Sequence, residues 1–371
     1  MDALILSCST GGGHNAAGTA VKQELEKRGH HVVMMDPYEL VSHKLAIGVG
    51  RVYVKMVQRM PKVFGFVYSL GSLVRHVPGM SPVYYANIVV AKKLRTYLAE
   101  HPFDVIIMPH LYPAELITYL KKSGEKLPLT IFVATDYVCI PFTEETDCDY
   151  YVVPGEEQVN NFVKRGISKE RILPFGIPVS PAFDEVTDQT QARAELGLEQ
   201  DTRYILLTGG SIGAGNIEKT IRILLFLFHK EAMRGKVIVV CGNNERLYER
   251  LNRRYGAQLI LLQKTNQMAT YMRACDLFIS KPGGLSSTEA AVTMVPYIQI
   301  TPIPGCETHN MRYFSQNGMS IAVRHPVLEL ISAVKKLCCA DRSEQMLEKQ
   351  QRGIPRNARG RLCDWIETQC S

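Results

Sequence analysis

The amino-acid sequence predicts an α/β fold with two doubly wound domains that face a central cleft. Three observations lead to this fold class. Short apolar segments alternate with helical segments along the chain, a pattern typical of parallel sheets. Glycine-rich turns follow the segments that end near residues 8, 208 and 280. The length of 371 residues exceeds what a single core usually supports, so two domains are expected.

The first domain opens with a strand, a glycine-rich turn and a helix. Ala3 to Cys8 is a short apolar segment, and the turn Ser9 to His14 follows it. Asn15 to Arg28 has the amphipathic pattern of a helix, which Gly29 ends. The next strand, at 31–36, completes a βαβ unit. Four further strands are predicted at about 104–108, 129–134, 149–153 and 171–174.

The second domain repeats this alternation. A turn-rich segment at 174–178 and a polar segment at 180–200 separate it from the first domain. The predicted domains are therefore residues 1–177 and 178–355, and residues 356–371 form a C-terminal helix with the option of crossing back to the first domain. The strands of the second domain are predicted at about 204–208, 236–240, 258–262, 276–280, 297–301 and 319–323.

The composition is that of a cytoplasmic globular protein. Hydrophobic residues make up 46% of the chain, but no apolar run reaches the roughly 18 to 20 residues of a transmembrane helix. The apolar start at residues 3–8 is too short for a signal peptide and lacks a basic region before it. The ten cysteines include no C-x-x-C pair, so we expect reduced thiols and no zinc site.

Positive charge is concentrated in one part of this chain, whose net charge is +7. Between Leu40 and Ala99 there is no Asp or Glu. A helix is predicted at 44–60, with an apolar stripe and with Arg51, Lys55 and Arg59 along its flank. Such a surface suits anionic lipid headgroups; a core-packed helix with a solvated basic edge is the alternative. No nucleic-acid-binding motif accompanies the patch, so nucleic acid is not an expected partner.

A nucleotide site is predicted in the second domain, at the run from Lys281 to Ala291. Gly283 and Gly284 stand at a strand-to-helix turn, where the backbone can approach a ligand and the first N–H groups of the helix, with Ser286 among them, point at an anion. Glu289 lies a turn further into the helix, where its carboxylate would accept hydrogen bonds from two ribose hydroxyls. Phosphate on the helix end and sugar on the acid is the chemistry of nucleotide binding.

The glycine-rich turn at the N-terminus allows two interpretations. Gly11, Gly13 and Ala16 satisfy the spacing of a dinucleotide-binding turn, with Asp36 where a ribose-binding acid belongs. A nicotinamide dehydrogenase is therefore a legitimate hypothesis. It leaves the second glycine-rich site unexplained, and no partner residues for hydride transfer follow in the sequence.

Three polar residues of the first domain are candidates for catalysis or acceptor binding. His14 stands at the start of a helix, which lowers the pKa of a histidine and keeps it neutral, as a general base must be. Asp136 closes a predicted strand and would orient the base or bind an acceptor hydroxyl, and His110 occupies a similar place after strand 104–108. Each of the three is alternatively a cap of its turn or helix.

Further loops of the second domain are candidates for donor binding. The loop from Thr208 to Asn216 heads this domain and includes Gly210 and Ser211; its backbone N–H groups would hold diphosphate oxygens. Gly242 follows strand 236–240 and would offer its backbone to a base edge, although a plain turn is the alternative. Asp147 and Asp149 have D-x-D spacing but precede a strand, so we expect no metal there.

These motifs resemble those of the monogalactosyldiacylglycerol synthase and processive diacylglycerol glucosyltransferase family. The resemblance extends in order over nearly the whole chain. The residues that carry it are Ser9-Thr10-Gly11-Gly12-Gly13-His14, Pro282-Gly283-Gly284, Glu289-Ala290, Pro296 and Gly305-x-Glu307-x-x-Asn310. Cys306 departs from the family, which usually has Gln at this position, and the family's histidine after Thr-Asp is absent from the run Asp136 to Pro141.

The resemblance implies a GT-B fold and an inverting, metal-independent glycosyltransferase that needs no cofactor. It implies a UDP-sugar donor, a diacylglycerol acceptor and a peripheral location on the cytoplasmic face of the cell membrane, bound to its anionic surface. Glucose is favoured over galactose. By position, His14 is the implied base, Gly210, Gly283 and Gly284 are diphosphate contacts, Glu289 binds the ribose, and Glu307 and Asn310 contact the donor sugar.

Two alternatives accompany this hypothesis. The transferase that adds N-acetylglucosamine to the cell-wall lipid precursor shares the fold and the glycine pattern. A non-catalytic, membrane-docked protein that binds a UDP-sugar would keep the loops of the second domain but would not need His14.

Overall fold

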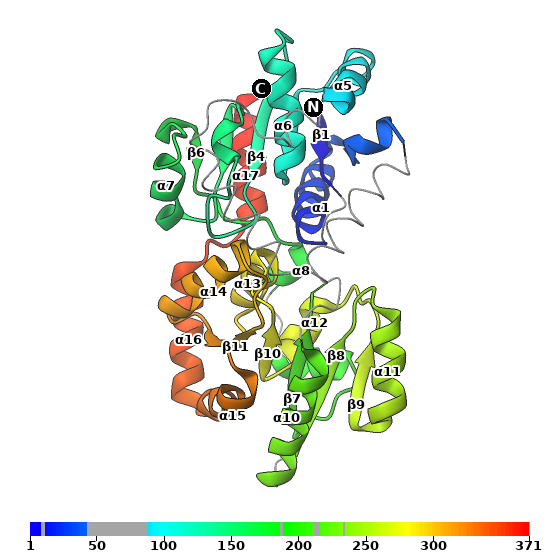
Figure 1. Ribbon diagram of the computed structural model, residues 1–371, viewed down its shortest axis with the longest axis vertical. Helices are drawn as coiled ribbons and strands as arrows, with labels where there is room; N and C mark the ends of the chain where they lie inside the picture. The colour runs from blue at the N-terminus through cyan, green and yellow to red at the C-terminus, as the bar shows by residue number, and fades with distance from the viewer. Residues whose placement is uncertain (9–11, 43–87, 186–187, 211–215, 233, 371) are drawn as a thin grey trace. The chain divides into compact units, whose positions relative to one another are not determined.

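The computed structural model describes residues 1–8, 12–42, 88–185, 188–210, 216–232 and 234–370 (Figure 1). The chain divides into two compact units. The N-terminal unit comprises Met1–Pro181, Pro304–Cys306 and Pro355–Ser371. The C-terminal unit comprises Ala182–Ile303 and Glu307–Ile354.

The N-terminal unit is built on a parallel sheet of six strands in the order β2-β1-β3-β4-β5-β6. Alternate side chains of β1 enter different cores: Leu4 and Leu6 belong to one cluster, and Ala3 and Ile5 to another. Both faces of the sheet are therefore covered, which is why its strands are apolar throughout. The strands are β1 (Asp2–Leu6), β2 (His31–Met35), β3 (Val105–Met108), β4 (Leu129–Val133), β5 (Tyr150–Val152) and β6 (Ile172–Leu173).

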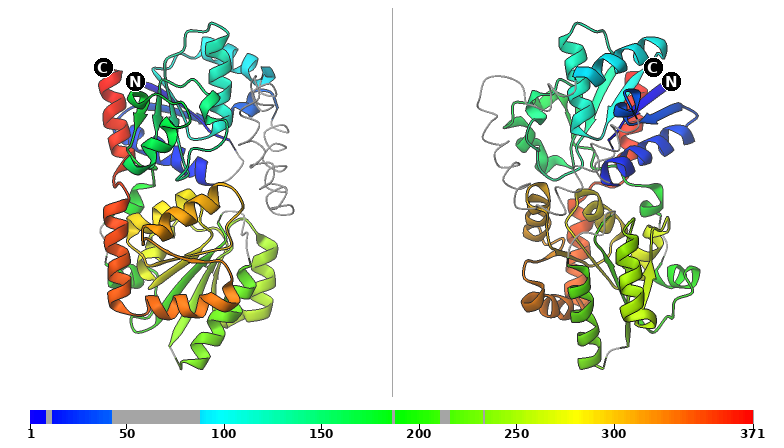
Figure 2. Two further views of the ribbon diagram at one scale, coloured as in Figure 1. Left: turned by 60° about the vertical axis from the view of Figure 1, so that its left-hand side comes forward. Right: turned by 45° about the vertical axis from the view of Figure 1, so that its right-hand side comes forward.

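Helices cover the two faces of this sheet. Residues of α5, α6 and α7 join the first cluster, and residues of α1 and α17 join the second. The C-terminal helix α17 thus packs beside α1, as Figure 2 shows in red and blue. Arg28 at the end of α1 contacts Asp364 at 2.6 Å and Glu367 at 2.9 Å. The helices are α1 (Gly12–Lys27), η1 (Pro37–Leu40), α5 (Ile88–Glu100), α6 (Leu111–Lys122), η2 (Thr143–Glu145), α7 (Glu156–Val163), η3 (Lys169–Arg171) and α17 (Ala358–Gln369).

The C-terminal unit has a second parallel sheet of six strands, in the order β12-β11-β10-β7-β8-β9. Its strands are β7 (Arg203–Thr208), β8 (Gly235–Val240), β9 (Leu259–Leu262), β10 (Leu277–Ser280), β11 (Tyr297–Ile300) and β12 (Ile321–Val323). Its helices are α8 (Pro181–Asp184), α9 (Gln189–Glu195), α10 (Ile217–Lys230), α11 (Glu245–Tyr255), η4 (Gly256–Gln258), α12 (Met268–Ala274), α13 (Gly284–Thr293), α14 (Cys306–Gln316), α15 (Pro326–Leu337) and α16 (Ala340–Gly353).

The strand order of each sheet reverses at one place. In the first sheet the chain leaves β1 toward β2 on one side and leaves β3 toward β4 on the other. In the second sheet the same reversal separates β7 from β10. Ligands of doubly wound sheets bind outside the carboxyl ends of the strands at such reversals. The turns after β1 and β3, and those after β7 and β10, are therefore the places to look for sites.

The structure confirms the predicted α/β class, with two parallel sheets. One boundary differs from the prediction: the first helix begins at Gly12 and not at Asn15, so His14 lies inside its first turn. The predicted helix at 44–60 with Arg51, Lys55 and Arg59 lies outside the described residues, as does Ser211. In the part of the chain that the structure describes, no helix has the length and hydrophobicity to cross a bilayer.

Candidate active site

The imidazole of His14 is held at the strand reversal of the N-terminal unit. Its Nδ1 lies 2.8 Å from the carbonyl oxygen of Pro109, which follows β3, and 2.9 Å from Oγ1 of Thr135, which follows β4. A carbonyl oxygen only accepts hydrogen bonds, so Nδ1 carries the proton and Nε2 keeps a lone pair. Burial lowers the pKa of His14, although the hydrogen bond to Pro109 opposes this shift. The ring is therefore neutral near pH 7 and able to accept a proton at Nε2.

His110 stands beside His14 and is neutral as well. The two rings meet edge to face, with centroids 4.5 Å apart. His110 caps the N-terminus of α6, where its Nδ1 accepts a hydrogen bond from the backbone N–H of Tyr112 at 3.1 Å. Burial, with a smaller contribution from His14, holds its pKa well below the usual value. An acceptor at Nδ1 places the proton of a neutral His110 on Nε2.

A small hollow opens in front of these histidines. Thr135 and Asp136 contribute polar groups from the segment after β4, and most of the remaining wall is apolar. Asp136 is half-buried on this wall. The apolar lining residues are Pro109, Leu111, Phe132, Ala134, Val138, Ile140 and Phe162. A neutral base beside a mainly apolar wall can deprotonate a hydroxyl carried by an apolar molecule.

In the C-terminal unit, the turn after β10 presents an open helix N-terminus. Gly283 caps α13 without any side-chain hydrogen bond. The first N–H groups of a helix have no intrahelical partner, and they carry the positive end of its dipole. Ser286 is half-buried in this first turn. The predicted contacts Gly283, Gly284 and Ser286 are therefore grouped at one uncapped helix N-terminus.

Glu289 lies one turn into α13 and is half-buried. Its carboxyl group has no hydrogen bond or ion pair with any residue that the structure describes. Burial raises the pKa of Glu289 to about 8. A carboxyl group that is desolvated but unpaired suits a ligand that supplies hydroxyl donors, as a ribose does.

Lys281 is the residue of this site that sequence reasoning missed. Its side chain passes over Gly210, which has a φ of +72°: a Cβ added there would lie 2.6 Å from Cε of Lys281. The Nζ atom forms an ion pair with Glu307, which also accepts a hydrogen bond from the N–H of Ile303 at 2.8 Å. The Lys281 side chain thus runs from the turn after β10 past Gly210 and ends at the carboxylate of Glu307. A lysine two residues before the glycine pair, in the run Lys281-Pro282-Gly283-Gly284, was the available signal in the sequence.

Other predicted donor contacts are engaged within the protein. The N–H of Gly210 donates to Oγ1 of Thr208 at 3.2 Å. Asn310 is fully buried, and its Nδ2 donates to the carbonyl oxygen of Pro282 at 3.1 Å. Asn310 therefore braces the turn at 281–284, and its contact with a sugar stays a prediction. Gly242 follows β8 with a φ of +62°, and its N–H donates to Gln263.

Asp147 and Asp149 have structural partners. Asp147 pairs with Arg171 at 3.2 Å, and Asp149 pairs with Lys121 at 2.7 Å. Partial burial opposes the charge of Asp149, but hydrogen bonds from Lys121 and Thr130 hold its pKa below the usual value. Among the described residues, no group of three His, Cys, Asp or Glu side chains has the arrangement of a metal site.

Comparison with known proteins finds two matching family models and relatives with named activities. The model of monogalactosyldiacylglycerol (MGDG) synthase matches residues 14–179, and that of the glycosyltransferase family 28 C-terminal domain matches residues 204–358. Monogalactosyldiacylglycerol synthase 2 of Arabidopsis thaliana is 28% identical over 87% of this chain and 71% of its own. The processive diacylglycerol beta-glucosyltransferase of Bacillus pumilus is 25% identical over 95% of this chain and 89% of its own.

Solved structures share the fold. MurG of Acinetobacter baumannii superposes with a TM-score of 0.62 at 15% identity, over 99% of both chains. UDP-GlcNAc 2-epimerase of Neisseria meningitidis reaches 0.65 at 14% identity, over 99% of this chain and 100% of its own. The fold and the matched domains define a glycosyltransferase of the GT-B class. The chain belongs to the family of monogalactosyldiacylglycerol synthases and processive diacylglycerol glucosyltransferases.

Proposed function

We propose that this glycosyltransferase moves a hexose, glucose in preference to galactose, from a UDP-sugar to diacylglycerol with inversion at the anomeric carbon. The observation that carries the proposal is the neutral His14 at the strand reversal, with Nε2 free of the Pro109 contact, in a hollow with a mainly apolar wall. The relatives' names supply the substrates: a diacylglycerol glucosyltransferase and monogalactosyldiacylglycerol synthases.

In the proposed reaction the acceptor hydroxyl gives its proton to Nε2 of His14. Its oxygen attacks the anomeric carbon from the face opposite UDP. The bond between that carbon and the diphosphate oxygen breaks, and UDP leaves with the electron pair. Asp136 and His110 are assigned to the acceptor side, where they shape and polarise the hollow.

The leaving diphosphate gains negative charge as this bond breaks. We assign its stabilisation to the N-terminus of α13, to the glycine turn at Gly210 and to the ammonium group of Lys281. Glu289 would bind the ribose and Glu307 the donor sugar, and Gly13, Gly242 and Ser211 stay donor contacts predicted from the sequence alone. With these groups in place we propose that the enzyme uses neither a metal ion nor another cofactor.

The acceptor is a lipid, so the enzyme must reach a membrane. We propose a peripheral location on the cytoplasmic face, with Arg51, Lys55 and Arg59 on the anionic surface; this part of the proposal rests on the sequence alone. Each basic residue near such a surface contributes about 1 kcal/mol. Changing all three to Glu should abolish sedimentation with anionic vesicles, and unchanged sedimentation would remove this segment from the docking surface.

The direct test of function offers the purified protein diacylglycerol together with UDP-glucose, UDP-galactose or UDP-N-acetylglucosamine. Mass spectrometry of the lipid product identifies the sugar and the number transferred. The proposal predicts hexosyl-diacylglycerol, formed fastest from UDP-glucose. Transfer of N-acetylglucosamine to a polyprenyl-linked cell-wall precursor, with none to diacylglycerol, would replace it. UDP binding without any transfer would indicate a non-catalytic binding protein.

A further inference from the structure

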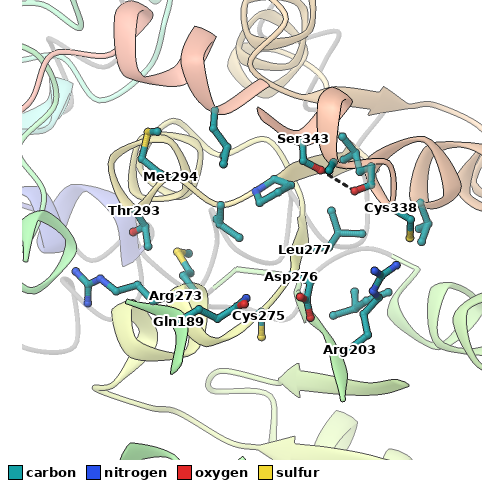
Figure 3. Close-up of a pocket in the computed structure, with 18 residues that line it drawn as sticks. Gln189, Arg203, Arg273, Cys275, Asp276, Leu277, Thr293, Met294, Cys338 and Ser343 are labelled. Carbon is teal, nitrogen blue, oxygen red and sulfur yellow. Dashed lines mark hydrogen bonds between the residues drawn. The ribbon is translucent and has the colours of Figure 1, made fainter. Parts of the chain in front are cut away.

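The C-terminal unit contains a cavity of about 430 Å³ (Figure 3). It lies at the amino ends of the central strands β7 and β10, whereas the candidate donor site lies at their carboxyl ends. Arg203 opens β7, and Asp276 directly precedes Leu277, the first residue of β10. Gly210 and Lys281 follow the other ends of these two strands. The last turn of α13, the end of α15 and the start of α16 complete the wall. The volume is within the range of small-molecule sites.

Much of the cavity wall is apolar. Apolar side chains from β7, α12, β10, the end of α13 and α15 contribute to it. These residues include Ile205, Met272, Leu277, Met294, Val334 and Leu337. A wall of this kind favours a ligand with a hydrocarbon part.

Positive charge at this cavity is not fully compensated. Arg203 is half-buried, and its guanidinium group has no hydrogen bond or ion pair with any residue that the structure describes. Arg273 donates to the carbonyl oxygen of Ala182, and burial lowers its pKa despite three acidic residues nearby. Asp276 is the one carboxylate on the described wall, and Arg193 and the N–H of Tyr204 already bind it at 2.9 and 2.7 Å. An anion would therefore find an unpaired partner in Arg203.

Two further features mark the opposite side of the cavity, where Figure 3 shows Thr293 and Met294. The Oγ1 atom of Thr293 is buried and has no hydrogen-bond partner within the described structure. Met294 ends α13 in the left-handed region, with a φ of 61°, where glycine is the usual residue. Backbone strain of this kind is concentrated at functional sites, and a buried polar atom without a partner is uncommon enough to need an explanation, which a ligand would supply.

We propose that this cavity is a binding site for a small amphipathic anion, with a carboxylate or phosphate head on Arg203 and a single hydrocarbon chain along the apolar wall toward Met294. A purely apolar ligand would leave the guanidinium group desolvated and unpaired, which is costly. A fully polar anion would leave the apolar wall in contact with water. An amphiphile satisfies both surfaces, because its charged head and its chain match the two parts of the wall.

The thiol of Cys338 can report whether a ligand occupies the cavity. Cys338 is half-buried on the wall, and the adjacent Cys339 is exposed and outside it. Iodoacetamide labelling of the full-length protein, read residue by residue by mass spectrometry, compares the two thiols. Octanoate and octyl phosphate separate the two head groups, and octanol serves as the uncharged probe. We expect saturable protection of Cys338 by at least one anion, no protection of Cys339, and an affinity for octanol at least about tenfold lower, since a charge-assisted contact is lost.

Variants test which residue holds the head group. Arg203→Leu should weaken anion binding about tenfold, whereas Arg246→Leu, an exposed arginine elsewhere in this unit, should leave it unchanged. Ala340→Phe adds volume at the exposed mouth and should block protection with both arginines intact. Equal affinity for octanol and the anions, equal effects of the two arginine variants, or no protection of Cys338 in the wild type would each overturn the proposal.

Discussion

The two strand reversals of this enzyme occupy equivalent places in two similar sheets, yet they are chemically opposite. The reversal between β1 and β3 gathers two neutral histidines against a mainly apolar hollow. The reversal between β7 and β10 gathers a lysine, two acidic residues and an open helix N-terminus. We propose that the same fold supplies a mainly apolar environment for moving a proton and a charged one for holding an anion. Selective changes at each reversal should affect different steps.

The largest effect is expected at His14. His14→Ala should lower kcat by roughly 10²- to 10⁴-fold, the usual contribution of a general base. The affinity for UDP should change little, since the groups assigned to the diphosphate and to the ribose belong to the other sheet. Steady-state kinetics with UDP-glucose and diacylglycerol measures the loss, and His101→Ala, at an exposed histidine, is the matched control. A variant with near wild-type kcat would exclude His14 as the base.

Lys281 should give the next largest effect. Lys281→Met removes the ammonium group and leaves Glu307 without its ion-pair partner beside the diphosphate. A charge-assisted contact contributes about 1.5 to 3 kcal/mol, so the Kd for UDP should rise roughly tenfold to a hundredfold. Calorimetry measures the Kd, with Lys264→Met, at an exposed lysine, as control. If both variants bind UDP equally well, Lys281 does not contact the diphosphate.

The binding of UDP should be coupled to the release of a proton from Glu289. Its raised pKa of about 8 keeps the carboxyl group largely protonated at pH 7. Ribose hydroxyls donate to the ionised form, so binding favours deprotonation, and the affinity for UDP should increase as the pH rises toward 8. Calorimetry at pH 7.5 in buffers of different ionisation enthalpy should show proton release by the wild type.

The matched variant for this measurement is Glu289→Gln, which keeps the shape of the side chain and removes its titration. It should bind UDP about tenfold more weakly than wild type and release fewer protons on binding. Proton release that is identical in the two proteins would assign the titration to another group and remove Glu289 from the ribose site.

The smallest effect is expected from chelation. Transfer should continue at its full rate in excess EDTA, since the proposed positive charge at the diphosphate comes from Lys281 and α13. Activity that EDTA abolishes and Mn²⁺ restores would require a metal at the second reversal and would contradict this division of roles.

The sequence predicted the features that depend on neighbouring residues, namely the strands, the turns and the helices. A strand, a glycine-rich turn and a helix follow one another within about 15 residues at His14 and at Glu289, so their periodicity and turn residues suffice. The contacts that define the sites join distant segments. His14 meets Pro109 and Thr135, and Lys281 meets Glu307, because of the order of strands in each sheet. Hydrophobic periodicity does not encode that order.

Asn310 also shows that a sequence motif does not specify what a side chain contacts. Its place in the motif predicts a contact with the donor sugar, which stays a prediction; the structure adds that its buried side chain donates to the carbonyl oxygen of Pro282. The motif gives the residue and its neighbourhood in sequence. Whether the amide faces a ligand or supports the loop that does so depends on how α14 packs against the turn after β10, which the sequence does not specify.

The most direct test of the division between the two reversals is one set of paired measurements. For His14→Ala and Lys281→Met, the Kd for UDP and the single-turnover rate at saturating UDP-glucose are measured side by side. We expect His14→Ala to lose rate by at least about 10²-fold with a Kd within about twofold of wild type, because UDP does not depend on the base. Lys281→Met should lose UDP affinity. A large loss of UDP affinity in His14→Ala, or an unchanged rate, would contradict the separation of proton transfer and charge stabilisation between the two sheets.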